Sequence, residues 1–297
     1  MIDSELPFFG FGVDIPKIIW QTGKEDFENL QYPFNINVET WKQVNPEWEY
    51  RYSNQKEKIS QINDFGDKDL SELSSKLWGA FLADLWRYIV IYNHGGVYVD
   101  LDTVARLPLD IIKYNITNKL NETFIMPDLG KWGYGTPNSP TTSMLVYKGS
   151  EDGKRVYCQG CYDFVEYILE RNGNKKIYLP NSSFAAIKRA KPIKYVLDEV
   201  KARFAMFKKL HDYDIDGIHG SILLSVDCSA WDYAINKNPK LVAQNFIYQY
   251  DATPLKGSLW ENESNKNKIL FKDEFIDYEI LQINKTSYNK FINKAVD

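Results

Sequence analysis

Residues 83–102 read ADLWRYIVIYNHGGVYVDLD, and this stretch decides how the fold is interpreted. The apolar residues before its two glycines recur every three or four positions, which predicts a long helix capped at its start by Ser74 or Ser75. Gly95 and Gly96 can supply the left-handed backbone that helix ends favour. The residues after them alternate in polarity, which predicts a strand over residues 97–102. The chain therefore runs from a helix through a glycine turn directly into a strand.

Four charged residues lie on this helix and strand. Asp84 and Arg87 are three positions apart, so they share one face of the helix. Asp100 and Asp102 lie at the end of the strand, where two carboxylates can share one hard divalent cation. Because the glycine turn returns the helix toward the same end of the sheet, we expect all four side chains to surround one ligand-binding crevice. A D-x-D pair alone is a weak signal, since such acidic residues are often solvated.

The flanking sequence predicts an α/β protein. Residues 15–21 and 48–52 have the pattern of strands, and a helix over residues 38–44 separates them, which indicates an α/β sheet. Further predicted elements are helices over residues 162–171 and 195–210, a strand over 176–179, a loop over 130–149, and strands or buried segments over 222–226 and 246–250.

Composition and charge exclude several classes of protein. The 297 residues include 36 Lys and Arg against 40 Asp and Glu, and the net charge of −4 argues against duplex DNA or an anionic membrane as the main partner. No run approaches the roughly 20 apolar residues of a membrane span, and no secretory signal is recognisable. We therefore expect a cytoplasmic protein without a transmembrane segment or a nucleic-acid partner. Cys158 and Cys161 form a C-x-x-C, but no second ligand pair accompanies them, so no zinc site is expected.

The string over residues 83–102 resembles the family 32 glycosyltransferases, which carry a D-x-D metal motif on the GT-A fold. That family groups capsule-type sugar transferases with the yeast initiating mannosyltransferase, and the large clostridial toxins share the core string. Residues 15–21, IPKIIWQ, look like the opening strand of the family, which usually reads I-P-K-I-I-H-Q. Residues 41–51 are similar to its W…N-P…Y-E-Y stretch, and Leu107-Pro108-Leu109 matches the segment after the metal motif. The resemblance thus covers about residues 15–110.

The resemblance implies a GT-A-like, nucleotide-sugar-binding α/β fold with a mixed central sheet flanked by helices. It also implies one domain over residues 1–297. In this division, residues 15–110 form the nucleotide-sugar and metal half, residues 111–250 form the acceptor half, and residues 251–297 form a closing C-terminal arm.

Family roles transfer to the matching residues as follows. Asp84, Arg87 and Asp100 would be the catalytic residues, and Asp84 and Arg87 would also hold the sugar hydroxyls and the diphosphate side of the donor. Asp102 would bind the metal directly, while Asp100 would contact the ribose, the donor sugar, or the metal through water. Trp20, Gln21 and Thr22 would line the nucleotide base pocket, with Trp20 as a stacking surface.

A closing motif is implied near the C-terminus. Ser258-Leu-Trp260 looks like the family's S-x-W ending, so Ser258 would complete the metal shell and Trp260 would contact the leaving group. Lys256 stands near the position of the usual His or Asn and would stabilise the diphosphate by its charge. The ordinary alternatives are a polar loop for Lys256 and Ser258, core packing for both tryptophans, and a surface ion pair for Asp84 and Arg87.

The implied activity is transfer of a sugar from a UDP- or GDP-sugar to a glycan or lipid-linked acceptor, with retention and with Mn²⁺ or Mg²⁺. Such an enzyme would serve polysaccharide biosynthesis. One alternative is a haloacid-dehalogenase-like phosphotransferase, because residues 97–104 also fit an apolar strand ending in D-x-D-x-T. There Asp100 would be the nucleophile and Asp102 the general acid/base. Another alternative is a protein that binds nucleotide sugars without turnover.

Overall fold

The protein is an α/β structure with a mixed six-stranded sheet. The computed structural model describes residues 15–31, 34–77, 79–101, 103–105, 109, 123–125, 147–148, 156–157, 159–171, 181, 183–211, 222, 225–226, 228–237, 242–244 and 271–273. The strands of the sheet, in spatial order, are β2 (Glu49–Ser53), β1 (Ile18–Thr22), β3 (Gly96–Val99), β8 (Ser183–Ala186), β5 (Thr123–Ile125) and β9 (Val242–Gln244).

One strand of this sheet, β8, runs opposite to both of its neighbours. β1 is parallel to both β2 and β3, whereas β8 is antiparallel to β3 and to β5, and β5 is parallel to β9. The predicted mixed sheet flanked by helices is therefore confirmed. Because β1, β2 and β3 run in one direction, their carboxyl ends meet at one edge, where open α/β sheets bind ligands.

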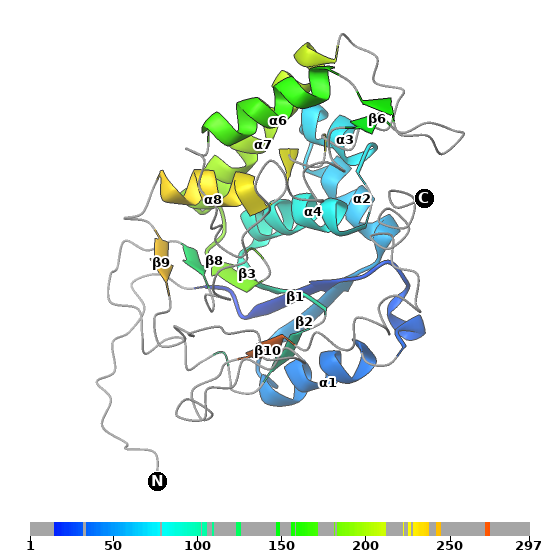
Figure 1. Ribbon diagram of the computed structural model, residues 1–297. Helices are drawn as coiled ribbons and strands as arrows, with labels where there is room; N and C mark the ends of the chain where they lie inside the picture. The colour runs from blue at the N-terminus through cyan, green and yellow to red at the C-terminus, as the bar shows by residue number, and fades with distance from the viewer. Residues whose placement is uncertain are drawn as a thin grey trace.

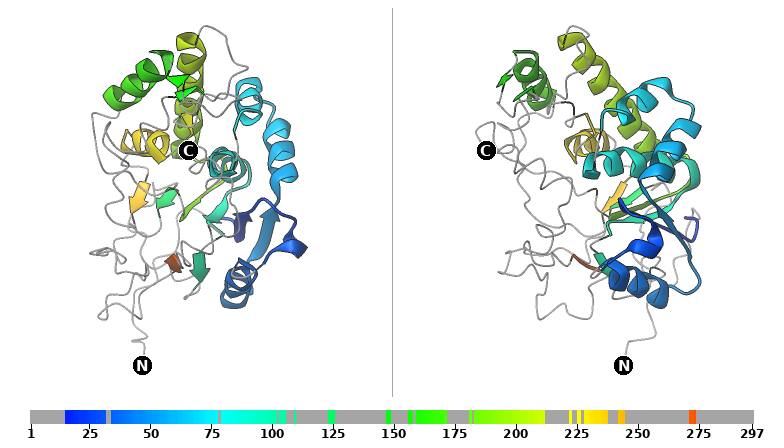
Figure 2. Two further views of the ribbon diagram at one scale, coloured as in Figure 1. Left: turned by 45° about the vertical axis from the view of Figure 1, so that its right-hand side comes forward. Right: turned by 90° about the vertical axis from the view of Figure 1, so that its right-hand side faces the viewer.

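Helices cover both faces of the sheet (Figures 1 and 2). One face carries α2 (Gln55–Asp64), α3 (Lys68–Ser74), α4 (Gly79–His94), α6 (Gln159–Arg171), α7 (Lys191–Leu210) and α8 (Cys228–Asn236), and the other carries α1 (Phe34–Val44). Successive side chains of β3 point to opposite faces of the sheet. Tyr98 faces the larger core, while Val97 and Val99 face the smaller core with Trp41 of α1. The predicted division of this strand's side chains between two faces is thus confirmed for residues 97–99, whereas the prediction that the strand continues through Asp100 and Leu101 is wrong.

Two short strand pairs complete the described fold. β6 (Tyr147–Lys148) pairs with β7 (Val156–Tyr157), and β4 (Thr103–Ala105) pairs with β10 (Phe271–Asp273). The second pair brings part of the predicted C-terminal arm alongside the residues that directly follow Asp102. A short 3-10 helix (Phe27–Asn29) follows β1. None of the described helices has the length and apolar composition needed to cross a membrane.

The junction between α4 and β3 depends on its two glycines. Gly95 and Gly96 have φ angles of +71° and +107°. A Cβ on Gly96 would lie 2.6 Å from the carbonyl oxygen of Ile18, and one on Gly95 would lie 2.7 Å from the backbone nitrogen of Lys188. A side chain at either position would therefore strain the backbone and collide with β1 or with the chain after β8. The glycine turn predicted from the sequence is confirmed.

The predicted start of the long helix is wrong. α4 begins at Gly79, whose φ of +52° separates it from α3, and α3 ends at Ser74. Ser74 donates its hydroxyl to the carbonyl of Ser71 within α3, so it does not cap α4. The hydrophobic pattern continues across this break because the helices on both sides pack into the same core.

Other predicted elements have mixed outcomes. The predicted strands at 15–21 and 48–52 and the helices at 38–44, 162–171 and 195–210 correspond to β1, β2, α1, α6 and α7. No strand is found at the described residues 222 and 225–226, which are buried. Predicted strands at 176–179 and 246–250 lie outside the described residues. The predicted loop at 130–149 contains strand β6, and α2, α3, α8 and β8 are among the elements that were not predicted.

Candidate functional site

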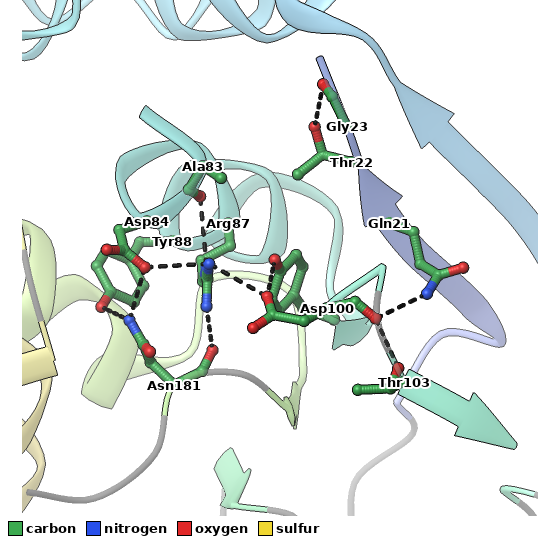
Figure 3. A network of polar contacts seen from close by, with 11 residues as sticks. Gln21, Thr22, Gly23, Ala83, Asp84, Arg87, Tyr88, Asp100, Thr103 and Asn181 are labelled. Atoms are coloured by element: carbon green, nitrogen blue, oxygen red, sulfur yellow. Dashed lines mark hydrogen bonds and ion pairs between the residues drawn. The ribbon is translucent and has the colours of Figure 1, made fainter. Parts of the chain in front are cut away.

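Three of the four predicted charged residues meet at the carboxyl end of β3. Arg87 Nη2 lies 3.0 Å from Asp84 Oδ1 and 3.2 Å from Asp100 Oδ1 (Figure 3). The Arg87 and Asp84 side chains are only 5% and 11% exposed, whereas Asp100 is 30% exposed. The alternative of a surface ion pair between Asp84 and Arg87 is therefore wrong. One arginine instead joins two carboxylates that come from a helix and a strand end.

Arg87 and its neighbour Tyr98 both keep their protons. Burial alone would lower the pKa of Arg87, but the charges of Asp100 and Asp84 outweigh burial and raise that pKa well above its usual value. Burial raises the pKa of Tyr98, so its phenol keeps its proton and donates a hydrogen bond to Asp100 Oδ1. Asp100 thus has one oxygen engaged by Arg87 and Tyr98, while no described residue contacts Oδ2 within hydrogen-bonding distance.

Asn181 completes the cluster and was not predicted as a site residue. Its side-chain amide donates to Asp84 Oδ1 at 3.0 Å and to the Tyr88 hydroxyl at 2.7 Å. Its backbone carbonyl accepts a hydrogen bond from Arg87 Nη1 at 2.7 Å (Figure 3). In the sequence, Asn181 appeared only as the start of an N-x-S triplet, and 97 residues separate it from Asp84. Sequence spacing therefore offered no signal that connects the two.

Gln21 and Thr22 support the strand ends. Gln21 is fully buried; its amide donates to the Asp100 backbone carbonyl at 2.9 Å, and its side-chain oxygen accepts from the Tyr50 hydroxyl at 2.8 Å. The Thr22 hydroxyl donates to the Ser53 carbonyl at 2.6 Å and so joins β1 to β2. Gln21 therefore holds the backbone of Asp100 in place from the neighbouring strand.

Trp20 lies in the core of the protein. Its ring is 2% exposed, its Nε1 donates to the Gly95 carbonyl at 3.0 Å, and it packs edge-on against Trp86. The guanidinium of Arg51 lies over the ring at 4.9 Å from its centroid. These contacts fit the core-packing alternative, because no open ring surface is left for a nucleotide base to stack on.

An aromatic hollow of about 430 Å³ lies next to Gln21. Phe27, Tyr50 and Tyr52 contribute to its lining, and Lys42 Nζ lies 4.5 Å from the centroid of Phe27. Tyr50 connects this hollow to the site through its hydrogen bond to Gln21. Partly exposed aromatic surface near the sheet edge is therefore provided by β2 and the segment after β1.

The remaining predicted site residues, Asp102, Lys256, Ser258 and Trp260, lie outside the described residues. Within the described part of the chain, no three His, Cys, Asp or Glu side chains form a metal-binding group. The chemistry of Asp100 nevertheless fits a hard divalent cation, because its Oδ2 is a carboxylate oxygen without a described partner on a partly exposed side chain.

Comparison with known proteins places this site in a recognised sequence region. Residues 33–121 match the family described as "Glycosyltransferase sugar-binding region containing DXD motif". This match includes α4, β3 and the three clustered charged residues.

Individual relatives are similar over part of their length. The initiation-specific alpha-1,6-mannosyltransferase of Schizosaccharomyces pombe is 31% identical over 106 residues, which are 34% of this chain and 25% of that protein. Inositol phosphoceramide mannosyltransferase 1 of the same yeast is 24% identical over 170 residues, 52% of this chain and 53% of that protein. The chain thus spans a quarter to a half of the curated relatives it matches.

Among solved structures, the ligand-free glycosyltransferase domain of the YGT toxin aligns with 77% of this chain and 79% of that chain. The identity is 10% and the TM-score is 0.40, a likeness too weak to carry an argument. The sequence match is the informative one. The chain therefore contains a DXD-type glycosyltransferase sugar-binding region and resembles the family 32 glycosyltransferases across it, as its motifs predicted.

Proposed function

We propose that this protein is a glycosyltransferase that moves a sugar from a nucleotide-sugar donor to a hydroxyl group of a glycan or lipid-linked acceptor. The observation that carries the proposal is the buried Asp84–Arg87–Asp100 cluster at the carboxyl edge of β1 and β3, within the segment matched to the DXD family. A cluster so enclosed is costly to desolvate, and such perturbed charges are concentrated at functional sites.

Each member of the cluster has a distinct task in this proposal. Asp84 and Asp100 orient the sugar hydroxyls and stabilise positive charge that develops at the anomeric carbon. Arg87 holds both carboxylates in register and adds positive charge on the diphosphate side of the bond that breaks. Asn181 holds Asp84 and Arg87 through its amide and its carbonyl. The cluster is therefore in place before the donor arrives.

A divalent cation fits this arrangement. Asp100 and Asp102 would hold Mn²⁺ or Mg²⁺, and Ser258 would complete the shell. When bound, the ion acts as a Lewis acid that neutralises charge on the leaving diphosphate. Asp100 Oδ2 is the described oxygen that remains for this role, because Oδ1 is engaged by Arg87 and Tyr98.

The acceptor attacks on the face from which the diphosphate leaves, so the anomeric configuration is retained. The support for this stereochemistry is the family 32 resemblance. Detection of a covalent glycosyl-enzyme on Asp84 or on another residue would contradict same-face attack.

The test is turnover of a donor panel. UDP-, GDP-, dTDP- and CMP-sugars, with nucleotide-linked mannose included because relatives are named mannosyltransferases, are incubated with Mn²⁺, Mg²⁺ or EDTA. We expect metal-dependent release of one nucleotide by the wild type and its loss in Asp102→Asn. Metal-dependent binding without release, even with acceptors present, would indicate a non-catalytic binder. Cleavage of a generic phosphate ester without nucleotide binding would indicate the phosphotransferase instead.

A further inference from the structure

A buried lysine lies beside the proposed donor site. Lys58 stands in the first turns of α2, directly after β2, and is 4% exposed. Its Nζ donates a hydrogen bond to the carbonyl oxygen of Gly23 at 3.0 Å. Within the described part of the chain, no carboxylate forms an ion pair with it, and no second acceptor receives its remaining two N–H bonds.

The contacts of Lys58 do not account for its charge. A buried ammonium is expensive to desolvate, and buried cations are therefore normally paired with a carboxylate. Burial, followed by repulsion from Arg87, lowers the pKa of Lys58 to about 8. The carboxylates that pair with Arg87, Asp84 and Asp100, form no ion pair with Lys58 in the described part of the chain. A hydrogen bond to the Gly23 carbonyl requires only a neutral donor, so the positive charge has no structural partner.

The position of Lys58 connects it to the same edge of the sheet as Asp100. Gly23 directly follows β1 and packs so closely that a Cβ there would lie 3.2 Å from Leu101 Cδ2 and 2.2 Å from the Tyr52 hydroxyl. Leu101 is the residue after Asp100. Figure 3 shows Thr22 and Gly23 at the end of β1, together with Arg87 and Asp100. Lys58 therefore reaches the strand ends where the donor would bind, from the side of α2.

We propose that Lys58 binds an oxygen atom of the nucleoside diphosphate part of the donor, to which it supplies a charged hydrogen bond. This inference rests on the proposed function and names a residue that recognises its substrate. The hydrogen-bond acceptor is either a carbonyl oxygen of the base, such as those of uracil and guanine, or an oxygen of the diphosphate. Either one satisfies an N–H bond that lacks a described acceptor, and a phosphate also relieves the repulsion between Lys58 and Arg87.

The experiment is calorimetric titration of the full chain with UDP, GDP, uridine and guanosine in the presence of Mg²⁺. Lys58→Met keeps the unbranched apolar stem and removes the charge. Lys56→Met is the matched control, because Lys56 is exposed on the same helix two residues earlier. We expect Lys58→Met to weaken nucleoside diphosphate binding about tenfold or more, the effect of losing one charged hydrogen bond, with Lys56→Met unchanged.

The nucleosides separate the two oxygen acceptors. If Lys58→Met weakens the binding of UDP and of uridine equally, Lys58 contacts the base. If it weakens the binding of UDP alone, Lys58 contacts the diphosphate. Both results support the proposal. Lys58→Gln is a second variant, which keeps a hydrogen-bond donor for the Gly23 carbonyl but removes the charge. If the charge of Lys58 is what binds the donor, this variant also weakens UDP binding.

Two outcomes contradict the inference in different ways. Equal binding by the wild type, Lys58→Met and Lys58→Gln would overturn it while leaving the proposed function intact. A folded wild-type protein that binds no nucleoside diphosphate would overturn the proposed function and the inference with it.

Discussion

Two buried arginine–carboxylate clusters in this molecule differ in how their charges are balanced. The site cluster, Asp84, Arg87 and Asp100, has two carboxylates on one arginine. The helix cluster is Arg171, Glu199 and Arg203, in which one carboxylate holds two arginines at 2.7 and 2.8 Å.

The carboxylate of the helix cluster is fully engaged, although Arg171 itself is 31% exposed. Both oxygens of Glu199 accept hydrogen bonds from arginines, and Arg203 also donates to the Ser229 hydroxyl at 2.7 Å. Burial would raise the pKa of Glu199, but the hydrogen bonds and charges of Arg171 and Arg203 lower it. The cluster joins α6, α7 and α8, and all hydrogen-bonding capacity of its carboxylate is used. Its contacts therefore serve packing.

The carboxylate of Asp100 is only partly used by comparison. One of its oxygens has no described partner, and the cluster lies at the carboxyl end of a strand. Burial of charge is thus common to both clusters, and free coordination capacity distinguishes the site.

The largest effect is expected from Asp100→Asn. Loss of the negative charge removes the free carboxylate oxygen while Arg87 keeps its ion pair with Asp84. We expect donor turnover to fall about 10²- to 10³-fold, the range for loss of one electrostatic contact to a transition state. Turnover is measured by nucleotide release, with urea unfolding as a check on folding. Unchanged turnover in a folded variant would exclude Asp100 from the chemistry.

The opposite pattern is expected from Glu199→Gln. Removal of this charge breaks the ion pairs of Glu199 with Arg171 and with the fully buried Arg203. We expect the free energy of unfolding to fall by about 3 to 5 kcal/mol, the usual loss when a buried ion pair loses one partner. Urea denaturation measures the loss, and nucleotide release per folded molecule should remain near the wild-type value. A selective loss of turnover would give the helix cluster a functional role.

Lys58→Met is expected to change stability in a pH-dependent way. The pKa of Lys58 is lowered from 10.5 to about 8 in the folded state. Below pH 8 both states of the protein carry the proton, so the full penalty of the buried charge, about 3 kcal/mol, opposes folding. Between pH 8 and 10.5 the unfolded state binds more protons, so wild-type stability rises with pH.

The expected result for this lysine is therefore a variant more stable than the wild type at pH 7. The difference should shrink as the pH approaches 10.5, and Arg87 keeps its charge throughout because its pKa is raised. Urea unfolding of both proteins at several pH values measures this. A difference that does not change with pH would mean that Lys58 titrates normally.

The smallest effect is expected from an exposed pair on α7. Lys194 and Asp198 form an i, i+4 ion pair with both side chains about half exposed. Lys194→Ala should change the free energy of unfolding by no more than about 0.5 kcal/mol, because such pairs are screened by water and salt. A loss of several kcal/mol in urea denaturation would remove the distinction between exposed and buried charges.

Sequence patterns predicted the parts of this architecture that depend on local spacing. Asp84 and Arg87 are on one helix face by periodicity, and the glycine turn carries the chain back to place Asp100 beside them. The exact start of α4 was missed because the apolar spacing continues across the break at Gly79.

The features of the site that were not predicted depend on packing between residues far apart in the sequence. Asn181 reaches Asp84 only because β8 pairs antiparallel with β3, a pairing that no local pattern specifies. Trp20 was predicted to line the base pocket, but its exposure depends on Trp86 and Arg51, which come from other elements. Similarly, the isolation of Lys58 from carboxylates is visible only in three dimensions.

The central claim, sugar transfer from a nucleotide donor, is tested most directly by following the anomeric proton of the donor by NMR. Wild-type protein is incubated with Mg²⁺ and the nucleotide sugar selected by the donor panel. We expect the donor signal to be replaced by that of a free sugar or glycoside with the same anomeric configuration, as nucleoside diphosphate accumulates. An intact donor in the presence of metal and candidate acceptors would contradict the claim, and a first-formed product of inverted configuration would contradict the proposed stereochemistry.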